Sequence, residues 1–266
     1  MRSRIRVSVA LLAFAMLFCS TSLFGQKADV QSAAVLAGAT LALGPGQPVN
    51  DIVLTGTVSH FDGVTKDSGS ATLKVKGADE SRIDLALSTP RSDVRTIQGA
   101  IPRGSWSKAN QAAQRHSLNN LFTPACWASP VNLIASLNRS GSTVSYVGQE
   151  QRFGVTVDHL RSTYVSPTMK TRDASALAAV QRLGTFDIYL DSLTHLPLSL
   201  MYNTHADDDA NIDIPVEVRF ANYTNVNGVL VPFHIQRLFR NQTNIDFTVT
   251  AAAINSGLLD SDFNVQ

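Results

Sequence analysis

"NYTNVNGVLVPFHIQRLFRN", residues 222–241, contains two apolar stretches joined by a single Asn-Gly pair. Asn227-Gly228 suits a two-residue type I′ turn, which requires a positive φ at both of its central positions. Strands are predicted on either side, over 215–226 and 229–239, and the turn fixes which residues pair across them. The stretch therefore predicts an antiparallel hairpin whose register follows directly from the sequence.

One face of this hairpin is predicted to be apolar and buried. The pairs that follow from the turn are Val226 with Val229, Asn222 with Phe233, Phe220 with Ile235, Val218 with Arg237, and Val216 with Phe239. The opposite face is polar and is predicted to point to solvent; it carries Glu217, Arg219, Tyr223, Asn225, His234, Gln236 and Arg240. The next strand, 245–254, brings Phe247 to the buried face only if the loop after Phe239 has an odd length, and we predict three or five residues there.

Arg237 is the single charge on the apolar face of this hairpin. An unpaired guanidinium is costly to bury, so either the aliphatic stem lies along the apolar wall with its head in water, or the head binds an anion. The planar fork of arginine suits the carboxylate or phosphate of a lipid. Both interpretations stay open on the sequence alone.

The first 25 residues have the pattern of an export signal, with three arginines in the first six positions, an apolar run over 7–18, and then small and polar residues. Cleavage is predicted after Gly25, with a cut after Ser22 as the alternative. Acylation of Cys19 is disfavoured because bulky residues precede it. The apolar run is shorter than the ~20 residues that span a bilayer. We therefore expect a periplasmic or secreted protein with no stable membrane span.

Residues 26–266 are predicted to form one α+β domain. Alternating apolar and polar positions predict antiparallel strands over 51–61, 69–76, 82–88, 142–149, 153–165, 185–191, 196–203, 215–226, 229–239 and 245–254. Helices are predicted over 28–43, with a flexible arm as the alternative, over 106–122, over 130–137 after Ser129 as cap, and over 173–183, capped by Asp173 and closed by Gly184. About ten strands and few helices predict an antiparallel sheet with helices on one side.

Residue types that would mark catalysis or metal binding are scattered along the chain. The six histidines lack the spacing of a metal site, and the serines and glycines form neither a nucleophile elbow nor a phosphate-binding loop. Asp207, Asp208 and Asp209 suit a solvated loop better than a calcium site. The 22 basic and 21 acidic residues are interspersed, which argues against a nucleic-acid partner. The sequence predicts no catalytic residue, no metal and no cofactor.

Cys126 is the only cysteine beyond the export signal, so no intramolecular disulfide is predicted. Its position beside Trp127 suits a small buried hydrophobe better than a reactive thiol.

The order of elements and two terminal motifs resemble those of secreted bacterial proteins related to the LolA-type carriers, which sort lipoproteins to the outer membrane. The motifs are Tyr-x-x-Val-x-Gly-Val-x-Val-Pro, here Tyr223 to Pro232, and Ile-Asn-x-x-Leu-x-Asp-x-x-Phe, here Ile254 to Phe263. The resemblance covers about residues 28–265. It implies an unclosed, strongly curved β half-barrel whose concave apolar face is covered by helices and holds acyl chains.

These observations favour a non-enzymatic envelope protein that binds a hydrophobic ligand, such as a lipid or an acylated protein, between sheet and helices. The residues expected to contact the ligand are Phe220, Phe233, Ile235, Arg237, Phe239 and Phe247. A structural or interaction protein with a filled core is the first alternative, and a hydrolase is the second; a histidine and a carboxylate together in a pocket would favour the hydrolase. We expect a monomer.

Overall fold

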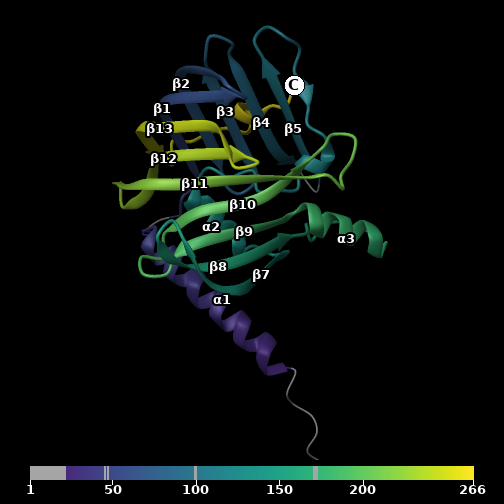
Figure 1. The fold of residues 1–266 in the computed structure, drawn as a ribbon, viewed down its shortest axis with the longest axis vertical. Helices are drawn as coiled ribbons and strands as arrows, with labels where there is room; N and C mark the ends of the chain where they lie inside the picture. The colour runs from purple at the N-terminus through teal and green to yellow at the C-terminus, as the bar shows by residue number, and fades with distance from the viewer. Residues whose placement is uncertain (1–21, 45, 47, 99–100, 170–172) are drawn as a thin grey trace, which may run out of the picture.

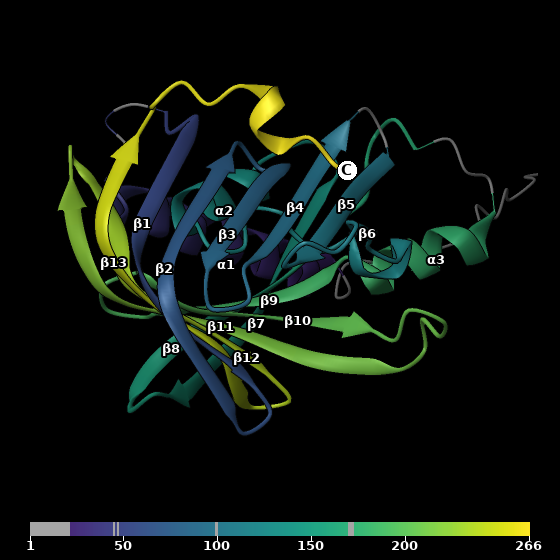
Figure 2. The same cartoon turned by 90° about the horizontal axis from the view of Figure 1, so that it is seen from above.

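A computed structural model describes residues 22–44, 46, 48–98, 101–169 and 173–266. One antiparallel sheet of thirteen strands runs through this part of the chain, in the order β6-β5-β4-β3-β2-β1-β13-β12-β11-β10-β9-β8-β7. The sheet is open, with β6 and β7 at its two edges, and it is strongly curved (Figures 1 and 2). The predicted α+β half-barrel is confirmed.

The strand bounds follow the predictions closely in the C-terminal half. The strands are β1 Asp51–Asp62, β2 Thr65–Lys76, β3 Glu80–Ala86, β4 Arg91–Gln98, β5 Ile101–Lys108, β6 Gln114–Arg115, β7 Ser142–Arg152, β8 Val155–Tyr164, β9 Thr185–Asp191, β10 Pro197–His205, β11 Asp213–Val226, β12 Val229–Phe239 and β13 Gln242–Ile254.

Three α-helices accompany the sheet in the described residues: α1 Ser22–Ala42, α2 Pro130–Leu137 and α3 Ala174–Leu183. Helices α1 and α2 lie inside the curve of the sheet (Figure 2), whereas α3 packs against β8. The side chain of Asp173 accepts hydrogen bonds from the backbone N–H groups of Ser175 and Ala176, at 2.8 and 3.4 Å, so the predicted cap of α3 is confirmed.

The helix predicted over 106–122 is wrong. Residues 101–108 form β5, which pairs with β4 along its whole length, and a short 3-10 helix follows at 118–120. β4 itself was not predicted, because its concave side carries Arg91, Asp93 and Arg95 rather than apolar residues such as Leu85 and Ile83, which lie opposite Arg91 and Asp93 on β3. Pairing across the sheet decides the conformation here, and the sequence has no apolar alternation that would reveal it.

The Asn227-Gly228 hairpin has the predicted register. The ladder runs from Val226 opposite Val229 to Val216 opposite Phe239, and φ is 51° at Asn227 and 87° at Gly228. At Asn222, whose φ is 56°, the ladder lacks one bridge, but the neighbouring pairs, Ala221 with His234 and Tyr223 with Pro232, keep the register that places Asn222 opposite Phe233.

The loop after Phe239 has two residues, and the prediction of three or five is wrong. A β-bulge between β12 and β13 inserts Asn244 as an extra residue and shifts the register, so Arg237 pairs with Ile245 and Ile235 with Phe247. The bulge thus does what an odd loop would have done, and Phe247 still faces the concave side.

The concave face beneath α1 and α2 is a packed core. Phe220, Ile235 and Phe247 are 3, 1 and 1% exposed, and the loop before α2 adds Cys126 and Trp127 to the same cluster. On the opposite face, Glu217 was predicted to face solvent but is buried, because Arg152 and Arg219 pack over it and bind its carboxylate at 3.3 and 2.7 Å.

His234 and Gln236 lie on the face opposite Ile235 and are half-buried rather than directed freely to solvent. Both contact the carboxylate of Asp246 on β13, at 2.7 Å from the His234 ring and 2.9 Å from the Gln236 amide.

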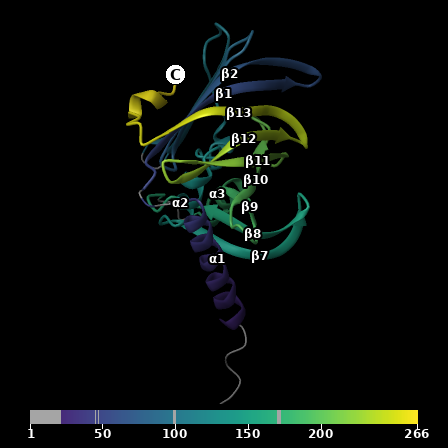
Figure 3. The same cartoon turned by 90° about the vertical axis from the view of Figure 1, so that its left-hand side faces the viewer.

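The C-terminal motif, residues 254–263, is anchored to the start of β1. The buried carboxylate of Asp51 accepts hydrogen bonds from the N–H and hydroxyl of Ser256, both at 2.7 Å, and from the N–H groups of Gly257 and Leu258, at 3.0 and 3.3 Å. Phe263 at the end of the motif is fully buried. Figure 3 shows this segment crossing the outside of the sheet near β1 and β2.

The export signal falls mainly on residues 1–21, which lie outside the described part of the chain, and its cleavage stays a prediction. The cut after Gly25 would fall within the first turn of α1.

Candidate functional site

An open cavity of about 320 Å³ lies on the concave face beside the packed core, and we call it the inner cavity. Its apolar wall is formed by Ile83, Leu85, Trp106 and Ile245, and its polar wall by His60, Arg91, Asp93, His116, Arg237 and Asn244, with Ser92 and Ser107 at the same site. Strand pairing builds the wall: Ile83 opposes Asp93, which opposes Trp106 on β5. Arg91 and Asp93, which interrupt the apolar pattern of β4, therefore also contribute to the polar wall of the cavity.

Arg237 lies on the concave side of β12 between the core and this cavity. Its Nη2 donates to Oδ1 of Asn244 at 3.1 Å, while its Nε is buried and has no hydrogen-bond partner among the residues that the structure describes. The guanidinium carbon lies 5.2 Å from the ring centres of both Trp127 and Phe239, which is within the range of a cation–π contact. Burial lowers the pKa of Arg237.

Asn244 is held in place by a second contact, since its amide donates to the carbonyl of Phe61 at 3.0 Å. The bulge that was not predicted thus delivers the polar residue that orients Arg237.

His60 and Arg91 enter the cavity from β1 and β4. His60 is 7% exposed, and burial, followed by the positive charges of Arg91 and Arg237, lowers its pKa, while Asp62 and Asp67 act weakly in the opposite direction. Arg91 makes one ion pair, at 3.4 Å, with Asp62. Because the side chain of Asp62 is 70% exposed, that pair holds Arg91 only weakly.

Asp93 is the acidic residue of the inner cavity. Its Oδ2 lies 3.0 Å from Nε2 of His116, and its Oδ1 lies 3.7 Å from Nε of Arg95. Although burial acts in the opposite direction, the hydrogen bond from His116 and the charge of Arg95 lower the pKa of Asp93 to about 2. Asp93 is thus a carboxylate at neutral pH and already has partners of its own.

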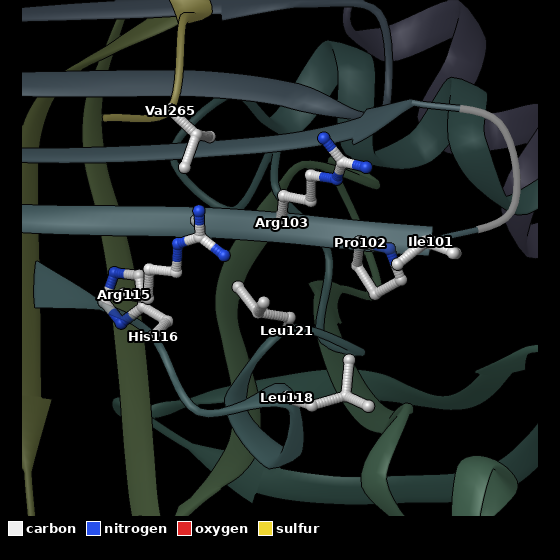
Figure 4. A pocket seen from close by; sticks show the side chains of 9 residues that line it. Ile101, Pro102, Arg103, Arg115, His116, Leu118, Leu121 and Val265 are labelled. Carbon is white, nitrogen blue, oxygen red and sulfur yellow. The ribbon is translucent and has the colours of Figure 1, made fainter.

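A second cavity, of about 450 Å³, lies at the sheet edge beside β5 and β6, and we call it the outer cavity. Figure 4 shows Leu118 and Leu121 between His116 and Arg115 on one side and Pro102 on the other. Arg103 and Arg115 are exposed, and neither binds another side chain in the described residues. His116 lines both cavities and separates them.

The predicted ligand-contacting residues divide into three groups. Arg237 lines the inner cavity, whereas Phe220, Ile235 and Phe247 belong to the packed core. Phe233 and Phe239 are half-buried and pack against that core. The sequence could not indicate the other lining residues, because Ile83, Asp93 and Trp106 are brought together only by the pairing of β3, β4 and β5.

Other features carry no site in the described part of the chain. No group of three or more His, Cys, Asp or Glu side chains is arranged to hold a metal ion there. Asp207 to Asp209 lie in the loop between β10 and β11. None of the helices described is both long and apolar enough to cross a membrane. Cys126 is fully buried, and burial raises the pKa of its thiol to about 12.

The fold recurs in several solved structures. A domain from Vibrio parahaemolyticus, described as an outer membrane lipoprotein-sorting protein, superimposes with a TM-score of 0.52 at 13% identity, over 86% of this chain and 94% of that one. A LolA-superfamily protein from Nitrosomonas europaea gives a TM-score of 0.50 at 10% identity, over 88% and 97%. The chain has the fold of the LolA superfamily. A DUF1329-family protein from Desulfovibrio piger has the same fold, with a TM-score of 0.50 at 11% identity over 88% and 97%.

The LolA-like fold is the extent of the likeness at these identities. Comparison with protein-family models and with curated protein sequences finds no match. The resemblance seen in the terminal motifs of the sequence is therefore confirmed as a shared fold, and any ligand has to be argued from the cavities themselves.

Proposed function

We propose that this LolA-like protein binds a small amphipathic ligand, a lipid or a single acyl chain, in the inner cavity and acts as a carrier rather than an enzyme. The observation that carries the proposal is an open cavity on the concave face with an apolar wall of Ile83, Leu85 and Trp106. Ligand sites are commonly concave and combine an apolar wall with converging polar groups. The inner cavity has four apolar and eight polar lining residues, which suits an amphipathic ligand better than a wholly apolar one.

The size of the cavity limits the ligand. About 320 Å³ is at the lower end of the ~300–1,000 Å³ of typical ligand pockets. The remaining concave surface is filled by α1, α2 and the core that includes Phe247. The cavity therefore suits one chain better than the several chains of an acylated protein. A filled core, the first alternative, describes the region under the helices but not the region beside β3 to β5.

A location in the bacterial envelope or outside the cell, and a monomeric state, belong to the same proposal. The arginine-rich start and the apolar run over 7–18 support export.

Native mass spectrometry of the protein purified from an envelope fraction tests the proposal. We expect a mature chain that begins at Gln26 and carries a lipid-sized adduct. Leu85→Trp, on the apolar wall of the cavity, should remove the adduct, whereas Leu193→Trp, at a site that is 87% exposed, should retain it. Thermal melts should show both variants folded. An adduct that survives Leu85→Trp, or no adduct on the wild type, would contradict the proposal.

A hydrolase is the second candidate, because His116 and Asp93 form a hydrogen-bonded pair in the inner cavity beside two serines. The hydroxyl of Ser92 donates instead to Asp84 at 2.7 Å, so it is not poised on His116. We expect no turnover of p-nitrophenyl esters above the buffer rate. Turnover that is lost in His116→Gln would replace the carrier with an enzyme.

A further inference from the structure

We infer that the inner cavity recognises the anionic end of its ligand, a phosphate, sulfate or carboxylate group, through the guanidinium of Arg237 together with Arg91 and His60. The inference rests on the proposed function and adds the chemical class of the ligand, which is an amphiphile with one apolar chain and one anionic group.

The first argument is the incomplete set of partners around Arg237. Its described hydrogen bond is to the neutral amide of Asn244, and its buried Nε has none. No described carboxylate forms an ion pair with it. Arg237 is half-buried, and a guanidinium withdrawn from water is stabilised by an anion, two of whose oxygens its planar fork can hold at once. An anion in the cavity would complete this set.

The second argument is that other positive or protonatable groups converge on the same space. Arg91 lines the cavity from β4 with only a solvent-exposed partner, Asp62. His60 lines it from β1, is buried, and has no hydrogen-bond partner in the described residues. These two groups and Arg237 come from three different strands, so the sheet rather than a flexible loop fixes their arrangement.

The third argument concerns Asp93, the carboxylate in the cavity that could compete. Asp93 contacts His116 at 3.0 Å and Arg95 at 3.7 Å. Asp93 is therefore hydrogen-bonded on the β4 and β6 side. Its negative charge also acts on Arg237, but in the described residues it forms no ion pair with Arg237 or Arg91, whose N–H groups can still donate to an anion. The apolar chain of the ligand would lie against Ile83 and Leu85, directly beside these charges.

The two tryptophans of the chain make the inference measurable, since Trp106 lines the inner cavity and Trp127 lies 5.2 Å from the guanidinium of Arg237. The intrinsic fluorescence is measured while decyl phosphate, decyl sulfate or decanol is added, the two anions below their micelle-forming concentrations and decanol below its solubility limit. We expect the two anions to bind at least tenfold more tightly than decanol. Inorganic phosphate is titrated alone, to separate recognition of the anion from recognition of an amphiphile.

Arg237→Met retains the stem and removes the charge. It should lower the affinity for both anions about tenfold and leave decanol binding unchanged. The melting temperature should be unchanged or higher, because a half-buried charge without an ion-pair partner in the described residues is removed. The matched control is Arg103→Gln with Arg115→Gln, which removes two arginines from the outer cavity and should leave all three affinities unchanged.

Several outcomes would overturn the inference. Equal affinity for decanol and the anions would show that the cavity does not recognise the anionic group of its ligand, while the carrier proposal would stand. If the outer-cavity control loses anion binding and Arg237→Met retains it, the anion site lies in the outer cavity at the sheet edge. Binding of inorganic phosphate as tightly as decyl phosphate would make the ligand a free anion. If none of the four probes binds and the envelope protein carries no adduct, the carrier proposal fails as well.

Discussion

Asp51→Ala is expected to detach the C-terminal segment from β1. The carboxylate of Asp51 accepts four hydrogen bonds from Ser256, Gly257 and Leu258 and is 4% exposed. A hydrogen bond to a charged group contributes ~1.5–3 kcal/mol. Residues 256 and 257 are exposed, so after the substitution water can accept hydrogen bonds from their donors and offset part of the lost stability. We therefore expect a loss of about 3 kcal/mol in the free energy of unfolding, equivalent to one or two such bonds.

Urea unfolding of the chain from residue 26 at pH 7 measures this loss. The backbone amides of residues 256–258 should also exchange hydrogen faster in Asp51→Ala than in the wild type. The hydrogen bonds from Ser256, Gly257 and Leu258 lower the pKa of Asp51 although burial acts against them. A carboxyl with a lowered folded pKa stabilises above its ordinary value of 3.8 and loses that contribution as the pH falls through the folded value. The difference in the free energy of unfolding between the wild type and Asp51→Asn should therefore become smaller below pH 3.8. A loss under about 1 kcal/mol in Asp51→Ala, or a gap that does not depend on pH, would refute this account.

Three further predictions concern the core and the cavity. Phe247→Ala should cost ~3–5 kcal/mol because Phe247 is 1% exposed, and Phe233→Ala should cost less because Phe233 is half-buried; equal losses by urea unfolding would contradict the packing described. Cys126 should resist a thiol reagent in the native chain from residue 26 and react on unfolding, since burial raises its pKa to about 12; native labelling would show the site to be open. Binding of decyl sulfate, whose charge is constant, should strengthen as the pH falls below 6.5, because His60 has a lowered pKa and gains a proton there, and His60→Gln should remove that component.

Much of the hairpin, and the strands that flank it, could be predicted from the sequence because a local signal fixes them. Asn227-Gly228 sets the turn, and the alternation of apolar residues along most of β11 and β12 shows which face is buried. The two-residue loop and the bulge at Asn244 could not be predicted, because an odd loop and an even loop with a bulge place Phe247 on the same face.

The region that forms the candidate site was the least predictable, and for a physical reason. β4 and β5 carry Arg91, Asp93, Arg95 and Gly104 toward the concave side, so neither strand shows the apolar alternation that reveals β1 to β3. The signal that could have been used was Arg237 itself, a charge on an otherwise apolar face. That residue does line the cavity, and its companions from β1 and β4 are visible only once the sheet is assembled.

A crystal structure of the protein with decyl phosphate tests the central claim most directly. The account predicts phosphate oxygens within ~2.7–3.2 Å of the guanidinium of Arg237, with the chain against Ile83 and Leu85. A phosphate bound between Arg103 and Arg115 in the outer cavity, or an inner cavity that holds only water at saturating ligand, would contradict it.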